Sequence, residues 1–163
     1  MNSITIDHTD LQILRLLQKD AKLTNKELAY ALRKGSNTIF DRVNRLKSLG
    51  YITGTVTLID RKKFGELLIA FTHVQINMHS TKSLTEFQQQ VVSFTEVLEC
   101  YHMTGVYDFM LKIAVRDMVS YNSFLVDKLA GLEHVGSLQS YFVINEAKRE
   151  LSYPLDDLIT LNA

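Results

Sequence analysis

The 163-residue sequence predicts an α+β protein built from two domains. Up to residue 49, apolar residues recur at the three- and four-residue spacing of amphipathic helices. From residue 67 onward, segments of alternating apolar residues take turns with segments of helical spacing. The charge also changes sign: residues 1–63 hold 12 Lys or Arg against 6 Asp or Glu, and the remaining residues hold the reverse. We therefore expect a basic N-terminal domain and an acidic C-terminal domain.

Two helices are predicted before residue 33. Asp7 is the expected N-cap of the first helix, and Asp10 lies at its third position, where a carboxylate stabilises the N-terminus. The side chains expected to be buried along this helix are Leu11, Ile13, Leu14, Leu16 and Leu17. Thr24 and Glu27 have the spacing of a capping box, which opens the second helix. Its expected apolar side consists of Leu28, Ala29 and Leu32.

A third helix is predicted after a short turn. The turn is Arg33-Lys34-Gly35, in which Gly35 can adopt special backbone angles without a steric cost from Cβ. The helix begins near Ser36, and its apolar face is expected to contain Ile39, Val43, Leu46 and Leu49. The second and third helices together form a helix-turn-helix.

The opposite face of the third helix is polar, with small residues first and then amides and guanidinium groups. Such a face suits a helix that lies in the major groove of DNA. The residues expected to contact DNA are Lys34, Ser36, Asn37, Thr38, Arg42, Asn44 and Arg45. The two arginines would bind phosphate or guanine. The alternative is an ordinary solvated helix face, but the basic surplus nearby favours a polyanion as the partner.

A β-hairpin is predicted directly after this helix. Gly50 is the expected C-cap, and residues 51–60 are rich in β-branched residues with Gly54 at a possible turn. A hairpin in this place is the wing of a winged helix, where Thr53 and Thr55 could contact phosphates. The alternative is a hairpin that only closes the hydrophobic core. The N-terminal domain would then span residues 1–60, followed by a charged linker at 61–66.

The second domain, residues 67–163, is expected to have a ferredoxin-like βαββαβ fold. The predicted strand, helix, strand, strand, helix and strand are residues 67–78, 82–94, 97–104, 108–116, 118–130 and 136–145. Two helices can cover only one face of the antiparallel sheet. Because the strands have apolar residues on both faces, we expect a second copy of the chain to cover the other, giving a homodimer.

Several function classes are not supported. Cys100 is the only cysteine, which excludes an intrachain disulfide and suits the reducing cytoplasm. There is no long apolar run for a membrane span and no signal sequence. The five histidines lack metal-ligand spacing, and no catalytic or cofactor motif is present. Cys100 and His102 share one strand face, so a thiolate–imidazole pair is the alternative to simple packing. We expect a protein that is not an enzyme and that binds neither a metal nor a cofactor.

Three sequence segments carry a resemblance to a known family. They are Ile6-Asp7-x-x-Asp10-x-x-Ile13-Leu14, Asp41-Arg42-Val43-Asn44-Arg45-Leu46-x-x-x-Gly50-Tyr51-Ile52 and Glu99-Cys100-x-x-x-Thr104-Gly105-x-x-Asp108-x-x-Leu111. In order and spacing they resemble the Lrp/AsnC family of transcription regulators, over nearly the whole chain. The resemblance implies an operator-binding winged helix, a C-terminal domain that binds an amino acid or related metabolite, and sheet-packed dimers that often assemble into octamers.

The resemblance also implies where the effector binds. The family's effector loop matches Thr104, Gly105, Val106, Tyr107 and Asp108, and the last strand of a neighbouring subunit matches at Leu138 and Ser140. A glycine turn exposes backbone N–H groups that can hold a carboxylate. Asp108 would hold an ammonium group or fix the turn. The alternative is that Gly105 and Asp108 only make a tight turn.

Two positions depart from the family pattern. The family usually has Gly-Leu-Ser-Pro before the third helix, where this chain has Arg33-Lys34-Gly35-Ser36, and Val106 stands where an acidic residue is frequent. Two other functions are alternatives to DNA binding. A metabolite-binding assembly protein disagrees with the basic N-terminal part, and a small ferredoxin-like enzyme lacks a pair of catalytic groups.

Overall fold

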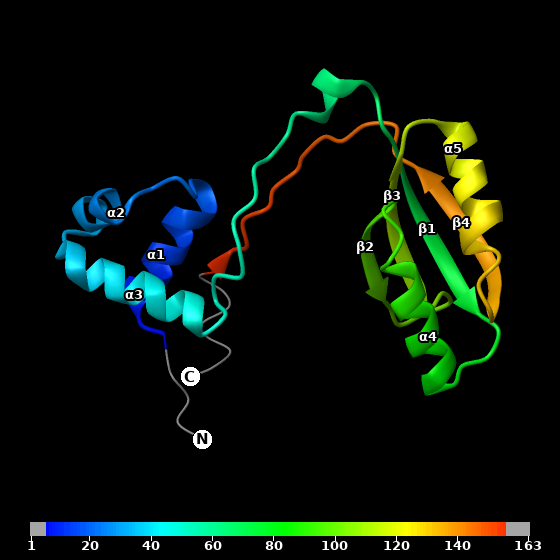
Figure 1. Ribbon diagram of the computed structural model, residues 1–163, viewed down its shortest axis with the longest axis horizontal. Coiled ribbons are helices and arrows are strands. Elements are labelled where there is room, and N and C mark those ends of the chain that lie inside the picture. Colours follow the sequence, from blue (N-terminus) through cyan, green and yellow to red (C-terminus); the bar gives the residue numbers. More distant parts are fainter. Residues whose placement is uncertain (1–5, 156–163) are drawn as a thin grey trace. The chain divides into compact units, whose positions relative to one another are not determined.

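The computed structural model describes residues 6–155, and these form two compact units (Figure 1). The N-terminal unit contains the chain up to Leu58 together with the segment from Lys148 onward. The C-terminal unit is Ile59–Ala147. Within the described residues, no helix is long and apolar enough to cross a lipid bilayer.

Three helices build the N-terminal unit: α1 (His8–Lys19), α2 (Asn25–Leu32) and α3 (Ser36–Ser48). The capping box predicted at Thr24 is present, and the predicted N-cap Asp7 forms a second capping box with Asp10. The Asp7 carboxylate accepts a hydrogen bond from the Asp10 N–H at 2.9 Å, and the Asp10 carboxylate accepts one from the Asp7 N–H at 3.0 Å. Thr24 and Glu27 make the corresponding pair of contacts at the start of α2. The helix start points predicted from these residues are therefore confirmed.

The turn between α2 and α3 differs from the expectation. Arg33 adopts the left-handed conformation, with φ 51° and ψ 48°, and Gly35 has the extended backbone of an N-cap, with φ −69°. The N–H of Lys34 donates to the Ala29 carbonyl at 2.9 Å and closes a Schellman-type end to α2. The left-handed position is the one immediately after the helix, so it falls on Arg33, two residues before the glycine.

The core of the N-terminal unit comes from the predicted apolar faces. Its buried members are Ile13, Leu28, Ala29, Ile39, Val43 and Leu46. Leu49, expected on the same stripe, is 37% exposed, because α3 ends at Ser48 and Leu49 is its C-cap. Gly50 follows with φ 79°, which confirms the predicted helix stop.

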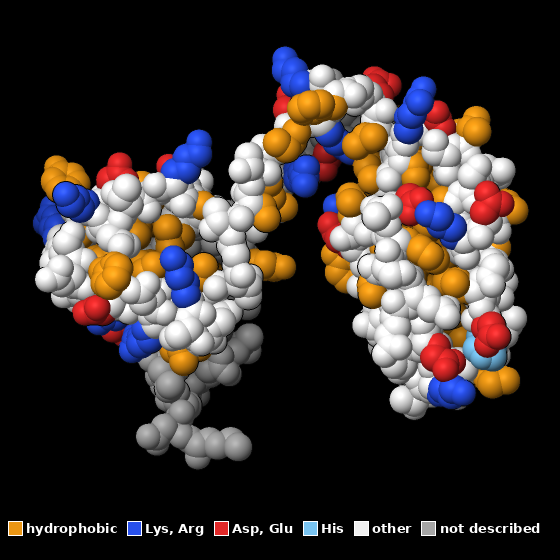
Figure 2. Space-filling model, viewed as in Figure 1, with side chains coloured by type: hydrophobic (Ala, Val, Ile, Leu, Met, Phe, Trp, Pro, Cys, Tyr) orange, Lys and Arg blue, Asp and Glu red, His pale blue; other side chains and the backbone are white. Residues whose placement is uncertain are grey.

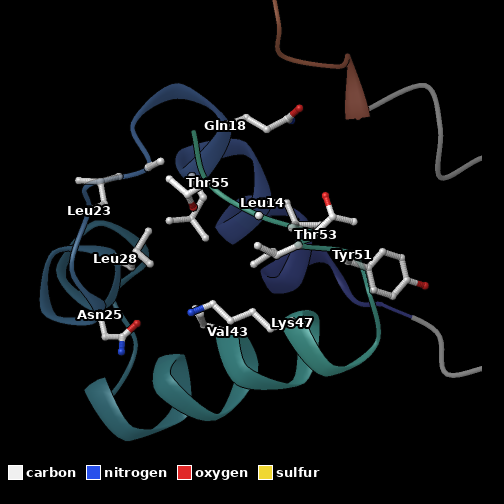
Figure 3. A pocket seen from close by; sticks show the side chains of 14 residues that line it. Leu14, Gln18, Leu23, Asn25, Leu28, Val43, Lys47, Tyr51, Thr53 and Thr55 are labelled. Atoms are coloured by element: carbon white, nitrogen blue, oxygen red, sulfur yellow. The ribbon is translucent and has the colours of Figure 1, made fainter. Parts of the chain in front are cut away.

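The predicted hairpin at residues 51–60 is not formed: that stretch contains no strand. Figure 3 shows Thr53 and Thr55 on a single extended segment that passes over a cavity of about 300 Å³ between the three helices. Gly54 has no left-handed φ that would reverse the chain. The β-branched residues favour an extended backbone, but they do not provide the turn that a wing needs.

The C-terminal segment also departs from the expected domain boundary at residue 163. From Lys148 onward, the chain groups with the helical unit. The Gln18 side chain accepts a hydrogen bond from the Tyr153 N–H at 2.8 Å and donates to the Tyr153 carbonyl at 3.3 Å. The Ser152 hydroxyl donates to the Gln18 carbonyl at 3.4 Å. Hydrogen bonds between one side chain and the backbone of a distant segment leave no periodic pattern in the sequence.

The C-terminal unit has the predicted βαββαβ order after a short 3-10 helix at Arg61–Phe64. Its elements are β1 (Leu68–Ile76), α4 (Thr81–Val91), β2 (Val97–His102), β3 (Phe109–Val115), α5 (Met118–Ser123) with a π-helical continuation at Phe124–Leu129, and β4 (Val135–Phe142). The strand order is β2-β3-β1-β4, and every neighbouring pair is antiparallel. The ferredoxin-like arrangement is confirmed.

One face of this sheet carries the helices and the core. Alternate residues of β1 and β3 are buried there, including Ala70, Val74, Leu111 and Ile113, and they pack with side chains of α4 and α5. Among the described elements of this unit, none covers the other face (Figure 1). It displays Phe71, His73, Gln75, Met110, Lys112, Gln139 and Tyr141, which alternate with the core residues along the strands.

Candidate nucleic-acid interface and effector loop

The polar face of α3 is accessible, as the sequence predicts. Lys34, Ser36, Asn37, Thr38 and Asn44 are all exposed. The side of the helix formed by Ile39, Val43 and Leu46 is buried and fixes the orientation of the polar side. Hydrogen-bonding side chains are therefore presented on the first two turns of the second helix of a helix-turn-helix, where a base-contacting helix places them.

The two predicted DNA-binding arginines have partners within the unit. An Arg42 nitrogen lies 2.7 Å from the Asp7 carboxylate and 2.9 Å from that of Asp10. Arg45 also pairs with Asp10, whose side chain is 0% exposed. These contacts join α3 to the start of α1. The structure therefore gives both guanidinium groups a bracing role that the charge pattern did not reveal.

Hydrogen bonding in this cluster shifts two pKa values. The pKa of Asp7 lies at about 2, below its usual 3.8, chiefly because its carboxylate accepts the Asp10 N–H and also because it faces Arg42. The pKa of Arg42 is raised by its hydrogen bonds to Asp7 and then Asp10. Both groups are thus held in their charged forms, which keeps the brace intact near neutral pH.

The described part of the N-terminal unit is basic, as the charge pattern along the chain predicts. Its described residues include eleven Lys or Arg and six Asp or Glu. On the face of this unit drawn in Figure 2, Lys and Arg side chains are interspersed with acidic ones. Charge therefore favours binding to DNA, and contacts from α3 to the bases would supply the sequence preference.

One prominent residue on α3 was absent from the predicted site. Phe40 is 52% exposed and lies one helical turn from Ser36 and from Asn44. The signal in the sequence was its position outside the apolar stripe of Ile39, Val43 and Leu46. Phe40 is apolar, so the polar pattern that predicts the other DNA contacts does not include it.

The expected effector loop lies between β2 and β3. Gly105 has φ 127°, a conformation that favours glycine, and Val106 is exposed at the turn. The Asp108 carboxylate accepts a hydrogen bond from the Ile76 N–H at 2.7 Å and lies 3.3 Å from His79. These contacts tie Asp108 to the end of β1.

Aromatic residues extend from this loop onto the open sheet face. The Tyr107 ring stacks on His73 with ring centroids 5.1 Å apart, and its hydroxyl donates to the side chain of Gln139. Tyr141 meets His73 edge-on at 5.5 Å. Nδ1 of His73 is buried and has no hydrogen-bond partner among the described residues. The loop is thus continuous with the open face of the sheet.

Leu138 and Ser140 point to the helix side of the sheet. Leu138 packs against the core, opposite Val74 on β1. The Ser140 hydroxyl shares hydrogen bonds with Tyr121 and Thr72, and those two hydroxyls are 2.8 Å apart. Within one chain, Ser140 is therefore part of an internal hydroxyl network rather than of the loop at residues 104–108.

On β2, Cys100 is partly buried, whereas His102 is exposed. Cys100 contacts the core, and burial raises the pKa of its thiol, which disfavours a thiolate. The His102 ring stacks on Phe109 at 4.8 Å. In the part of the chain that the structure describes, no group of three or more His, Cys, Asp and Glu could hold a metal ion. The packed-strand interpretation is the one the geometry supports.

A helix-turn-helix with an accessible second helix, joined to a separate sheet domain, is typical of a DNA-binding transcription regulator. Comparison with known families agrees. Residues 6–53 match the family model for winged helix-turn-helix DNA-binding, and residues 69–153 match the model for the Lrp/AsnC ligand binding domain. The chain belongs to the Lrp/AsnC family of transcriptional regulators, and it is not an enzyme.

Relatives and solved structures match along most of the chain. Transcriptional regulator AzlB of Bacillus subtilis is 32% identical over 95% of this chain and 99% of its own length. The leucine-responsive regulatory protein of Escherichia coli is 30% identical over 88% of each. A transcriptional regulator of Neisseria meningitidis, solved as a complex with L-Met, has a TM-score of 0.87 at 31% identity, covering 94% of this chain and 99% of that one.

Proposed function

We propose that a cytoplasmic homodimer of this chain binds a two-fold operator through α3 and that an amino acid changes this binding. The observation that carries the proposal is the exposed polar start of α3 in a helix-turn-helix. The orientation of α3 is stabilised by the Asp10 cluster, in which Asp10 on α1 pairs with Arg42 and Arg45 on α3. Ser36, Asn37 and Asn44 would contact bases, and Lys34 and Thr38 would contact phosphates. Half-sites would lie about one helical turn (~10 bp) or a multiple apart.

The dimer would form through the open sheet face. Tyr101 and Tyr141 are about half exposed there, beside Met110 and Phe71. An exposed aromatic face of this kind on a soluble domain marks a protein contact. The same face on each copy gives a two-fold dimer, and further contacts between dimers would give an octamer.

The effector would bind beside Gly105. The turn exposes backbone N–H groups suited to an α-carboxylate, and the Asp108 carboxylate, fixed by Ile76 and His79, stands next to it. The Neisseria regulator was solved with L-Met. By analogy, an amino acid is the ligand class to test first. Strand β4 of a second copy, on which Leu138 and Ser140 lie, would be next to the site.

DNA binding is tested with duplexes selected from a random pool by the full chain. Affinity should fall steeply as salt rises. Asn37→Ala and Asn44→Ala should weaken specific binding by about 1–3 kcal/mol without changing stability. Lys34→Ala should reduce the salt slope by about 1. Lys82→Ala, an exposed cation on α4, is the matched control and should change neither quantity. A flat salt response would contradict the proposal.

The assembly is tested by sedimentation. Tyr141→Arg on the open face should dissociate the dimer and weaken operator binding together, because one copy offers only one α3. Val126→Arg on the helix-covered side, where Val126 is also exposed, is the control and should leave the dimer intact. A wild-type chain that sediments as a monomer at micromolar concentration would contradict this part of the proposal.

Effector binding is tested by thermal shift with the twenty amino acids, since a ligand that binds only the folded chain raises its apparent stability. Gly105→Ala should abolish the shift because alanine is strained at φ 127°. Gly54→Ala is the control, because Gly54 has open space around it and no left-handed φ. If no amino acid produces a shift, the ligand class is wrong while the DNA-binding proposal stands.

A further inference from the structure

We propose that Phe40 recognises a thymine by packing on its C5-methyl group in the major groove, an inference that rests on the proposed function. The starting observation is an apolar ring on a polar helix face. Phe40 is 52% exposed, whereas Ile39, its neighbour in sequence, is fully buried. Phe40 belongs neither to the core of the N-terminal unit nor to any aromatic contact among the described residues.

The position of Phe40 on α3 places it with the base-contacting residues. It follows Ser36 by four residues and precedes Asn44 by four, so all three lie on one side of the helix. Phe40 is in the second turn, about 6 Å along the axis from Ser36. In a helix-turn-helix complex the first turns of the second helix meet base edges. Phe40 would therefore lie between two polar contacts, over the floor of the groove.

The charges around Phe40 indicate that it faces DNA bases and not phosphates. Arg42 and Arg45, the cations nearest in sequence, are held by Asp7 and Asp10 on the flank of α3. The adjacent exposed side chain, Asp41, is negative. A phosphate next to this stretch would meet a carboxylate and no free guanidinium group, which is unfavourable. The stretch is better suited to the interior of the groove, where direct base contacts are made.

The chemistry of a phenyl ring selects among the four base pairs. Thymine alone presents an apolar methyl group in the major groove, and the other base edges present donors and acceptors. A phenyl ring pressed on a polar edge removes water without replacing its hydrogen bonds, which is costly. On a thymine methyl it buries apolar surface on both sides. Phe40 thus confers a preference for thymine at one position of each half-site.

The test uses the full chain and operators selected by it from a random pool. Each thymine is replaced in turn by 2′-deoxyuridine, which deletes only the methyl group. Wild-type affinity should fall about fourfold per half-site at one thymine, the effect of one methyl group leaving an apolar contact. Phe40→Ala should bind more weakly and lose sensitivity at that thymine alone. Phe40→Leu, which keeps an apolar contact, should retain part of it.

Phe64→Ala is the matched control, because Phe64 is 82% exposed but lies outside α3, and it should keep the wild-type methyl sensitivity. If Phe40→Ala keeps full sensitivity at every thymine, or changes the sedimentation of the chain without changing base preference, Phe40 contacts something other than thymine and the inference is overturned. If the wild-type chain selects no sequence, the proposed function itself fails. The two failures are thereby distinguished.

Discussion

Arg33 holds a backbone conformation that its side chain does not favour. It is an exposed arginine at φ 51° and ψ 48°, at the position after α2 where glycine is most common. Arg33→Gly should therefore increase the free energy of unfolding by about 1 kcal/mol. Urea denaturation measures this change.

Lys34→Gly is the control for that substitution. Lys34 is also exposed, but it does not have a positive φ. Glycine there gains no steric relief and makes the unfolded chain more flexible, so stability should stay equal or fall slightly. Equal stabilisation by both substitutions would show that the left-handed conformation of Arg33 costs nothing.

The Asp10 cluster predicts a second effect of a single side chain. The buried Asp10 carboxylate accepts hydrogen bonds from Asp7, Arg42 and Arg45. Asp10→Ala should destabilise the N-terminal unit by about 2 kcal/mol, because three donors lose their acceptor together. Asp41→Ala, which removes an exposed carboxylate from α3, should change stability by less than about 0.5 kcal/mol. Thermal unfolding of the two variants compares them.

For single residues, the sequence predicts which type of side chain lies on a given face better than it predicts which other side chains it contacts. The polar character of α3 and the caps at Asp7 and Thr24 were predictable because they depend on spacings of three and four. The pairing of Arg42 with Asp10 spans 32 residues of sequence and depends on how α1 packs on α3. A charge pattern contains no information about that packing, so the arginines were assigned to DNA alone.

At the scale of elements, the helix caps should make stability depend on pH. The pKa of Asp7 is held at about 2, against its usual 3.8, chiefly by the Asp10 N–H, and the pKa of Glu27 is lowered by the backbone and hydroxyl of Thr24. Each lowered pKa contributes stability that is fully present above the unfolded value. That stability is lost as the pH falls through the folded value.

Helix α1 should therefore weaken between about pH 4 and pH 2, and α2 should weaken as the pH falls below the ordinary Glu pKa of 4.5. Circular dichroism of the full chain follows their loss. Asp7→Asn removes the titrating carboxylate of α1 and should flatten the part of this dependence that Asp7 causes, at the expense of lower stability at pH 7. An unchanged acid profile in Asp7→Asn would mean that other carboxylates account for the transition.

The elements themselves were largely predictable, and the exceptions have physical causes. All the helices and strands with clear periodicity lie where expected. Residues 51–60 have the composition of strands but no turn that pairs them. The π-helical stretch Phe124–Leu129 keeps the same apolar face as an α-helix, with the Ala130 N–H donating to the Leu125 carbonyl at 2.8 Å. That change of hydrogen bonding leaves no mark in the sequence pattern.

For the whole molecule, the division into a DNA-binding part and a ligand-binding part was predictable from periodicity and charge. The path of the chain was not, because it passes from one unit to the other twice, near residue 58 and near residue 148. A strand-like tail with a few backbone contacts has no amphipathic pattern of its own. Its hydrogen bonds to α1 are made to a single polar residue, Gln18, near the end of that helix.

The contacts between α1 and the segment after residue 147 predict the effect of removing that segment. A chain ending at Ala147 should lose stability in the N-terminal unit and keep it in the C-terminal unit. The segment that is removed supplies both hydrogen bonds to the Gln18 side chain and the Ser152 contact to its carbonyl. At about 1 kcal/mol for each net hydrogen bond, the loss is about 2–3 kcal/mol. Hydrogen exchange should then quicken at α1 amides and stay unchanged at β1 amides.

Gln18→Ala in the full chain separates this contact from other effects of truncation. It removes only the side-chain hydrogen bonds to Tyr153, so it should reproduce part of the faster exchange at α1. Gln88→Ala, an exposed glutamine on α4, is the matched control and should leave α1 unaffected. Faster exchange at β1 with α1 unchanged would instead assign the tail to the C-terminal unit, as the sequence alone had suggested.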